Sequence, residues 1–148
     1  MSMPLNIVVA EDNPHDVTFV RMALEEAGLD CELRVLGDGE AALTYIESLE
    51  KDSGRQVIDL LLLDLNLPKR DGEEVLKRLR STERIAQTPV IVMTGSEETK
   101  AYESAQNNAA VHYFRKPSNF AEYMRLGTIV RELVFSRNSA CGGVSDSR

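Results

Sequence analysis

Residues 60–68 read Leu-Leu-Leu-Leu-Asp-Leu-Asn-Leu-Pro, and this stretch decides the fold. Four consecutive leucines leave no polar position for a solvated side, so we predict a strand from about Val57 to Leu63 that is buried on both faces. Such a strand belongs at the centre of a parallel sheet. It stops at Asp64, which places a carboxylate at the end of a central strand.

The rest of the chain alternates apolar runs with helical patterns, which is typical of βαβ units. The run at 31–36 alternates apolar and polar residues, so we place it at an edge of the sheet. The predicted strands cover about 5–10, 31–36, 57–63, 90–93 and 111–115, and the predicted helices about 14–27, 42–49, 72–79, 98–107 and 120–135. Five such units indicate a flavodoxin-like, doubly wound α/β fold with five parallel strands in the order 2-1-3-4-5.

The predicted domain covers residues 4–135, and a chain of 148 residues can bury one adequate core. Residues 136–148 are rich in Ser and Gly and almost free of large apolar side chains, so we expect a polar, disordered tail. Pro14 suits the first turn of the first helix, with Asp12 or Asn13 as its cap.

Composition excludes several classes of protein. The net charge of −7 argues against a nucleic-acid surface, which usually needs a basic patch. A small basic cluster is interpreted as a solvated helix face and not as a docking site; it comprises Lys77, Arg78, Arg80 and Arg84. No apolar run approaches a membrane span and no secretory signal is visible. Two cysteines are too few for a disulfide scaffold, so we expect a reducing cytoplasm.

Chemically complementary side chains follow four of the predicted strands. Glu11 and Asp12 follow the first strand, Asp64 the third, Thr94 the fourth and Lys116 the fifth. Ligands of doubly wound sheets bind outside the carboxyl ends of the strands, where the strand order reverses. Three carboxylates gathered there repel one another, and Mg²⁺ with oxygen ligands removes that repulsion.

A metal at this edge would allow phosphoryl chemistry. Asp64 can act as a nucleophile toward phosphorus and form an aspartyl phosphate. Lys116 can pair with one phosphoryl oxygen, Thr94 can donate a hydrogen bond to another, and Gly95 leaves room for the donor molecule.

Each of these residues also has an ordinary structural interpretation. Glu11 and Asp12 could cap a helix, and Thr94 could do the same. Asp64 could cap a turn before Pro68, and Lys116 could be a solvated lysine. Tyr113 could be a half-buried aromatic of a strand. The coincidence of complementary groups at four strand ends favours one joint site.

The quoted motifs resemble those of a bacterial response-regulator receiver domain, over about residues 5–135. They are Glu11-Asp12, residues 62–68 with Gly72 following, Thr94-Gly95 and Lys116-Pro117. The resemblance implies that Asp64 is the phosphoacceptor. It also implies that Mg²⁺ is held by Glu11, Asp12, Asp64 and the main-chain carbonyl of Asn66.

Further roles follow from the same resemblance. Lys116 would contact the phosphoryl group, Thr94 and Tyr113 would move on phosphorylation, and the Lys116–Pro117 peptide would be cis, an isomer that X–Pro bonds adopt cheaply. Glu11 stands where Asp is commoner in the family, and its longer side chain could reach the metal through water. Asn66 would point toward the site and tune the phosphate lifetime, in a direction that the sequence does not give.

The resemblance implies a sensor histidine kinase or a phosphotransfer protein as the partner. The chain ends after its fifth helix, so a stand-alone receiver is expected, without enzymatic activity beyond its own phosphoryl transfer and slow dephosphorylation. The loop at 51–56 and the segment 64–69 are similar to those of regulators that partner bacterial phytochrome kinases. For that subfamily we expect a homodimer through the helix 4–strand 5–helix 5 face, with a monomer as the alternative.

Two other functions require sequence features that this chain lacks, and a third stays open. A phosphatase of the haloacid-dehalogenase type needs a second Asp two residues after the first, where this chain has Asn66. A flavodoxin needs a Ser/Thr/Gly-rich phosphate loop, and Glu11 and Asp12 would repel that phosphate. A binding module that uses the receiver shape without phosphorylation stays open as the alternative.

Overall fold

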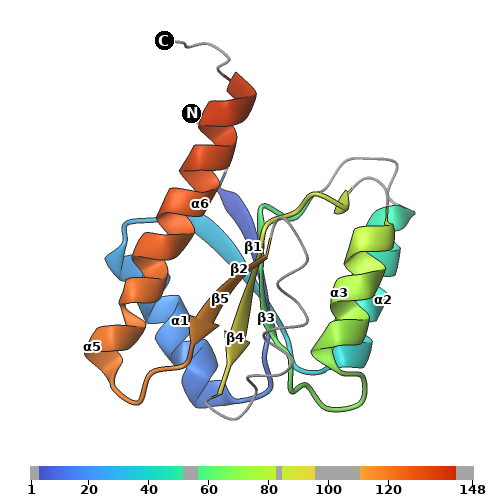
Figure 1. The fold of residues 1–148 in the computed structure, drawn as a ribbon, viewed down its shortest axis with the longest axis horizontal. Coiled ribbons are helices and arrows are strands. Elements are labelled where there is room, and N and C mark those ends of the chain that lie inside the picture. The colour runs from blue at the N-terminus through green and yellow to red at the C-terminus, as the bar shows by residue number, and fades with distance from the viewer. Residues whose placement is uncertain (1–3, 52–56, 83–84, 96–110, 143–148) are drawn as a thin grey trace.

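A five-stranded parallel sheet forms the centre of the protein (Figure 1). The computed structural model describes residues 4–51, 57–82, 85–95 and 111–142. The strands are β1 (Leu5–Ala10), β2 (Cys31–Leu36), β3 (Leu60–Asp64), β4 (Val90–Thr94) and β5 (Val111–Arg115). They lie in the order β2-β1-β3-β4-β5, which confirms the predicted doubly wound α/β fold.

Helices cover both faces of this sheet. They are α1 (Pro14–Glu26), α2 (Gly39–Glu50), α3 (Gly72–Ser81), α5 (Phe120–Tyr123) and α6 (Arg125–Gly142). Figure 1 shows α1, α5 and α6 on one face and α2 with α3 on the other. No helix in the described ranges combines the length and the apolar character needed to cross a membrane.

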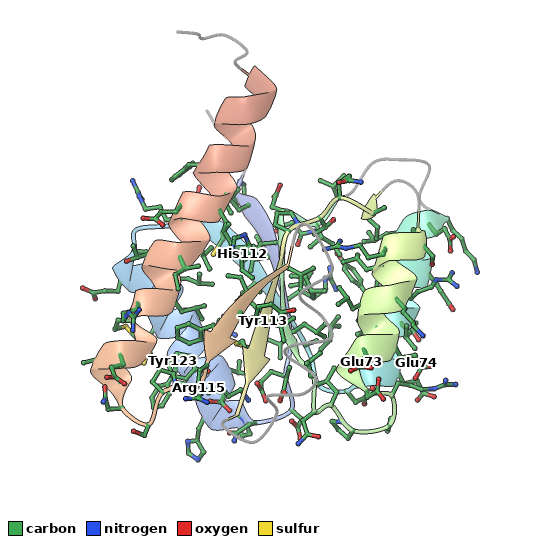
Figure 2. All side chains as sticks on the ribbon, in the orientation of Figure 1. Glu73, Glu74, His112, Tyr113, Arg115 and Tyr123 are labelled. Atoms are coloured by element: carbon green, nitrogen blue, oxygen red, sulfur yellow. The ribbon has the colours of Figure 1, made fainter. Side chains whose placement is uncertain are left out.

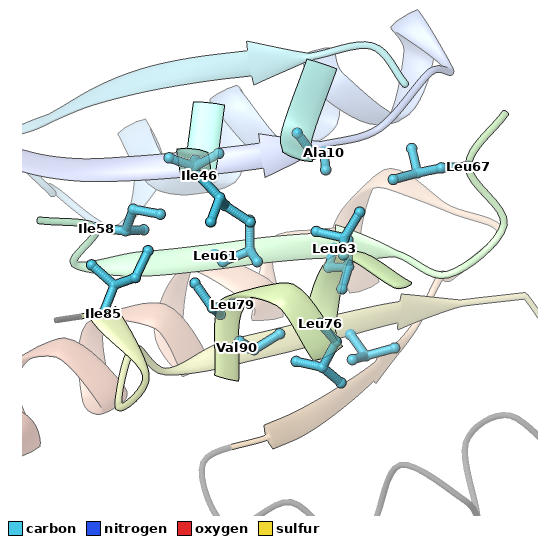
Figure 3. Packing of buried hydrophobic residues seen from close by; sticks show 14 of the residues in the cluster. Ala10, Ile46, Ile58, Leu61, Leu63, Leu67, Leu76, Leu79, Ile85 and Val90 are labelled. Carbon is cyan, nitrogen blue, oxygen red and sulfur yellow. The ribbon is translucent and has the colours of Figure 1, made fainter. Parts of the chain in front are cut away.

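The leucines of β3 supply both layers of the core. Leu60 and Leu62 face α1 and α6, whereas Leu61 and Leu63 face α2 and α3, because successive side chains of a strand point to opposite sides. All five residues of β3 are buried. Figure 3 shows Leu61 and Leu63 packed among side chains of α2 and α3. Full burial of one such side chain contributes roughly 1.5–3 kcal/mol, so the four leucines fix the strand at the centre.

Local sequence sets where the helices begin. Asn13 caps α1, since its side chain accepts hydrogen bonds from the main-chain N–H groups of His15 and Asp16. Asp38 caps α2 and Asp71 caps α3 in the same manner. Because Asn13 and not Asp12 caps α1, the carboxylate of Asp12 is not used by the helix cap and can contribute to the site.

The last predicted helix differs from the structure at two points. It divides at Met124 into α5 and α6, although the apolar periodicity runs through both pieces. In addition, α6 continues to Gly142, past the expected end at Phe135, so residues 136–142 are helical where a disordered tail was expected. No proline stops the helix there, and it ends where the glycine pair 142–143 begins. The predicted helix at 98–107 lies outside the described residues.

The predicted basic cluster is only partly a solvated face. Lys77, Arg78 and Arg80 lie on α3, and Arg84 lies outside the described residues. Arg78 pairs with Glu50 of α2 at 2.5 Å, as an exposed pair of the kind that contributes little. Arg80 instead points inward and donates hydrogen bonds to the carbonyls of Ala86 and Thr88. For Arg80 the prediction was wrong, because its long side chain reaches main-chain carbonyls of the segment that leads into β4.

Candidate functional site

The carboxyl ends of β1 and β3 bring three acids together. Ala10 pairs with Leu63 across the two strands, so Glu11 and Asp64 follow side by side. One carboxylate oxygen from each of Glu11, Asp12 and Asp64 lies within 4.8 Å of the others. Glu11 and Asp64 are 1% and 5% exposed, whereas Asp12 faces solvent. The structure therefore joins the acids that the sequence placed at separate strand ends.

Main-chain N–H groups orient the two buried acids. Glu11 Oε2 accepts a hydrogen bond from the N–H of Asn13 at 3.1 Å, and Asp64 Oδ1 accepts one from the N–H of Asn66 at 2.9 Å. One carboxylate oxygen of each acid is thereby fixed by its own loop. The second oxygen of each faces the centre of the site, where it meets Lys116.

The loop after Asp64 folds back tightly and requires a glycine. The N–H of Gly72 donates to the carbonyl of Leu65 at 3.0 Å. A Cβ at Gly72 would lie 2.5 Å from Leu65 Cα and 2.8 Å from the Asp64 carbonyl oxygen. Only glycine permits this close approach, which holds the start of α3 against the end of β3.

Lys116 extends from the end of β5 into the acid cluster. Its Nζ lies 2.7 Å from Glu11 Oε1 and 3.2 Å from Asp64 Oδ2. A third carboxylate, Asp16 of α1, approaches the same ammonium at 3.1 Å. The sequence predicted the first two neighbours and missed Asp16. The available signal was its place in the first turn of the predicted helix, a few residues after the Glu11-Asp12 pair.

Burial and charge shift the acid–base properties of this site. Burial raises the pKa of the Glu11 carboxyl to about 7, with Asp64 adding to the rise and Lys116 opposing it. Burial alone would lower the pKa of Lys116, but Glu11, Asp64 and Asp16 outweigh that effect and raise it. Lys116 therefore stays an ammonium ion at neutral pH, while Glu11 changes its charge near neutrality.

The three carboxylates fit a small divalent cation. Mg²⁺ takes oxygen ligands and commonly uses few carboxylates with waters completing its shell. A buried Glu11 whose pKa is raised is a group that a cation would keep ionised. A metal there would be held by Glu11, Asp12 and Asp64, and would neutralise negative charge. The main-chain carbonyl of Asn66 as a further ligand stays a prediction.

Thr94 and Tyr113 lie on the two strands beyond β3. Thr94 ends β4, and the pairing of Asp64 with Met93 brings Thr94 to the same sheet edge as the acids. Tyr113 is half-buried on β5, where it packs on the side of the sheet that α2 and α3 cover (Figure 2). Its placement agrees with a strand aromatic, and its movement as a switch stays a prediction.

The Lys116–Pro117 peptide differs from the expectation drawn from the family resemblance. No peptide bond in the described ranges is cis, so this bond is trans. The expectation of a cis bond is wrong for this structure. The trans isomer is the preferred one for X–Pro bonds by about 0.5–1 kcal/mol.

A sequence model described as the response regulator receiver domain matches residues 7–126, which include every acid of the site and Lys116. The chain belongs to this family. The receiver domain here is 34% identical over 139 residues to the probable methanogenesis regulatory protein FilR2 of Methanothrix harundinacea, covering 94% of this chain and 89% of FilR2. It is 37% identical over 93 residues to the response regulator Rcp1 of Synechocystis, covering 63% of each chain. The chain spans about half the length of several longer curated relatives.

Solved structures show the same receiver architecture. The phosphorylated cyanobacterial phytochrome response regulator RcpA is similar with a TM-score of 0.76 and 29% identity, over 91% of this chain and 96% of RcpA. The Mn²⁺-bound form of Rcp1 is similar with a TM-score of 0.72 and 30% identity, over 87% of this chain and 93% of Rcp1. The chain is thus a receiver-domain response regulator, a signalling protein related to RcpA and Rcp1.

Proposed function

We propose that this receiver accepts a phosphoryl group on Asp64, with Mg²⁺ bound by Glu11, Asp12 and Asp64. The observation that carries the proposal is the position of Asp64 Oδ2, which faces the Lys116 ammonium at 3.2 Å inside the acid cluster. A carboxylate oxygen held in position beside the ammonium of a lysine suits nucleophilic attack on phosphorus. The phosphorylated RcpA and the Mn²⁺-bound Rcp1 support the same assignment by similarity.

The residues of this chain have separate tasks in that transfer. A carboxylate oxygen of Asp64 attacks the phosphorus in line, the P–N bond of a phosphohistidine breaks, and its electron pair returns to the imidazole nitrogen. Lys116 neutralises charge on a phosphoryl oxygen, and the Asn66 N–H holds the other oxygen of Asp64. When bound, Mg²⁺ supplies further charge neutralisation. Thr94 and Tyr113 would then shift and alter a surface that a partner reads.

The proposed donor is a sensor histidine kinase or a phosphotransfer protein in the cytoplasm. Similarity to RcpA, a phytochrome response regulator, supports a phytochrome kinase as that donor. Slow loss of the phosphate would be the remaining chemistry of the chain. We also propose the homodimer that the family resemblance led us to expect, through the face formed by the predicted helix at 98–107, β5 and the last helices α5 and α6. The predicted helix at 98–107 falls outside the described residues.

Intact mass spectrometry after incubation with acetyl phosphate and Mg²⁺ tests the proposal. We expect one phosphoryl adduct on the wild type and none on Asp64→Asn, with the fold retained. Asp59→Asn is a matched control. Asp59 directly precedes β3, at the other end of the strand from Asp64, and it accepts a hydrogen bond from the N–H of Asn6. Asp59→Asn should label like the wild type.

Size-exclusion chromatography of the same samples tests the switch. A shift in elution that accompanies the adduct would show that phosphorylation controls assembly. A folded wild type that takes no adduct would contradict the proposal and favour the binding module that works without phosphorylation.

A further inference from the structure

Among the described residues, Asp16 is the one carboxylate in contact with Lys116 that does not belong to the acid cluster of Glu11, Asp12 and Asp64. It lies in the first turn of α1, and its side chain is 17% exposed. Asp16 Oδ2 is 3.1 Å from Lys116 Nζ, while its Oδ1 accepts a hydrogen bond from the Tyr123 hydroxyl at 3.1 Å. The two carboxylate oxygens of Asp16 thus bind different partners, Lys116 and Tyr123.

Tyr123 holds its hydroxyl in a fixed place. The residue is 1% exposed on α5, and its ring lies 5.3 Å from that of Phe19 and 5.6 Å from that of Phe114. Figure 2 shows Tyr123 on α5, beside the end of β5 that carries Arg115. Because packing fixes the ring, the hydroxyl orients Asp16, and Asp16 in turn faces the ammonium of Lys116.

Lys116 and a divalent cation need two of the same carboxylates. Glu11 Oε1 and Asp64 Oδ2 contact the ammonium, and both acids also belong to the cluster that can hold a cation. A cation that takes these acids competes with Lys116 for them. Asp16 stands apart from that cluster, so it is the carboxylate that can keep the ammonium in place when the other two turn to the metal.

We propose that Asp16 is a positioning residue, oriented by Tyr123, which retains Lys116 beside Asp64 while a divalent cation occupies the acid cluster. The inference rests on the proposed metal site. Without Asp16, the ammonium would depend on Glu11 and Asp64 alone and would oppose cation binding there. Asp16 therefore lets one small site hold two positive centres at once, the ammonium and the metal.

A double-mutant cycle on Mg²⁺ affinity tests this role, with isothermal titration calorimetry on the full chain. The four proteins are the wild type, Asp16→Asn, Lys116→Met and the double variant. We expect Asp16→Asn to weaken Mg²⁺ binding about threefold to tenfold in the wild-type background, and much less when Lys116 is already Met. That dependence on Lys116 separates positioning from a general effect of lost charge or altered structure.

Two further variants sharpen the result. Tyr123→Phe keeps the ring packing and removes only the hydroxyl, so it should weaken Mg²⁺ binding in the same Lys116-dependent manner, by a smaller factor. It also decides the question if Asp16→Asn does not fold. Glu26→Gln removes one exposed charge at the far end of α1 and should leave the affinity unchanged.

Three results would overturn the proposal. Equal weakening by Asp16→Asn in both backgrounds would show a long-range charge effect only, and no weakening would show no role. A folded wild type that binds no Mg²⁺ would overturn the metal site itself, and the role of Asp16 with it. The wild-type titration therefore distinguishes a failure of the proposed function from a failure of this inference alone.

Discussion

The ammonium of Lys116 lies closer to Glu11 than to Asp64, the proposed acceptor, at 2.7 Å against 3.2 Å. The buried Glu11 carboxyl is thus the principal counter-ion of Lys116 when no metal is present. Even so, burial raises the pKa of Glu11 to about 7, so the ammonium offsets only part of the desolvation penalty. Protons, the lysine and a divalent cation all compete for this one side chain.

The metal-free protein should become less stable as the pH rises through 7. The folded-state pKa of Glu11 is raised, so its contribution to stability is complete below the unfolded value of 4.5 and is lost as the pH passes about 7. We expect a decrease of on the order of 1–3 kcal/mol in the free energy of unfolding across this window. Urea denaturation at several pH values, with EDTA to keep the protein free of metal, measures this decrease. Glu11→Gln should flatten that part of the profile, and an unchanged slope in the variant would assign the effect to other groups.

Mg²⁺ binding should strengthen as the pH rises over the same range. A protonated Glu11 cannot serve as a ligand, and with a pKa of about 7 its ionised fraction grows about tenfold between pH 6 and pH 8. Calorimetric titration at both pH values should therefore show an affinity about tenfold higher at pH 8. Glu11→Gln should bind more weakly and lose most of this dependence. Wild-type affinity that does not vary with pH would contradict a role for Glu11 as a ligand.

Gly72→Ala should destabilise the protein and shift the proposed acceptor Asp64. The added Cβ would lie 2.5 Å from Leu65 Cα, so the loop after Asp64 must move. We expect a loss of about 1–3 kcal/mol in urea denaturation, together with slower labelling by acetyl phosphate. Gly37→Ala is the matched control, because a Cβ added at Gly37 would meet no atom within 4 Å. Similar losses in both variants would show that the close approach at Gly72 is not the cause.

Arg80→Met should destabilise the segment between α3 and β4. Arg80 Nη1 donates hydrogen bonds to the carbonyls of Ala86 and Thr88, at 2.9 and 3.0 Å. Their loss should lower the free energy of unfolding by about 1–3 kcal/mol without changing Mg²⁺ affinity. Lys77→Met on the same helix is exposed and should be close to neutral. Equal stability of the two variants would show that the hydrogen bonds of Arg80 do not stabilise the protein, as for a residue on a solvated face.

Most of the fold was predictable from residues whose burial or exposure follows from their chemistry. The leucines at 60–63 can only be buried on both faces, which places β3 at the centre and Asp64 at its end. Polar alternation placed β2 at the edge in the same way. The acids and Lys116 were then predictable as one site, because parallel strands end at a common edge.

Interactions that depend on the angle between elements were not predictable. Asp16 is an ordinary acid in the first turn of a helix until α1, α5 and β5 are placed together. The break at Met124 also escaped detection, because apolar spacing continues across it. Arg80 was misjudged since its carbonyl partners follow in a loop whose path the periodicity does not reveal.

The partners of Lys116 are far away along the chain, with Asp64 and Asp16 separated from it by 52 and 100 positions. Synthesis proceeds from the N-terminus, so both acids leave the ribosome well before the lysine does. A nascent or truncated chain that stops before β5 would present Asp64 without its ammonium partner. On the proposed function, the chain would become competent for phosphorylation only after β5 and Lys116 have been made, and unfinished copies would not divert the phosphoryl group from complete ones.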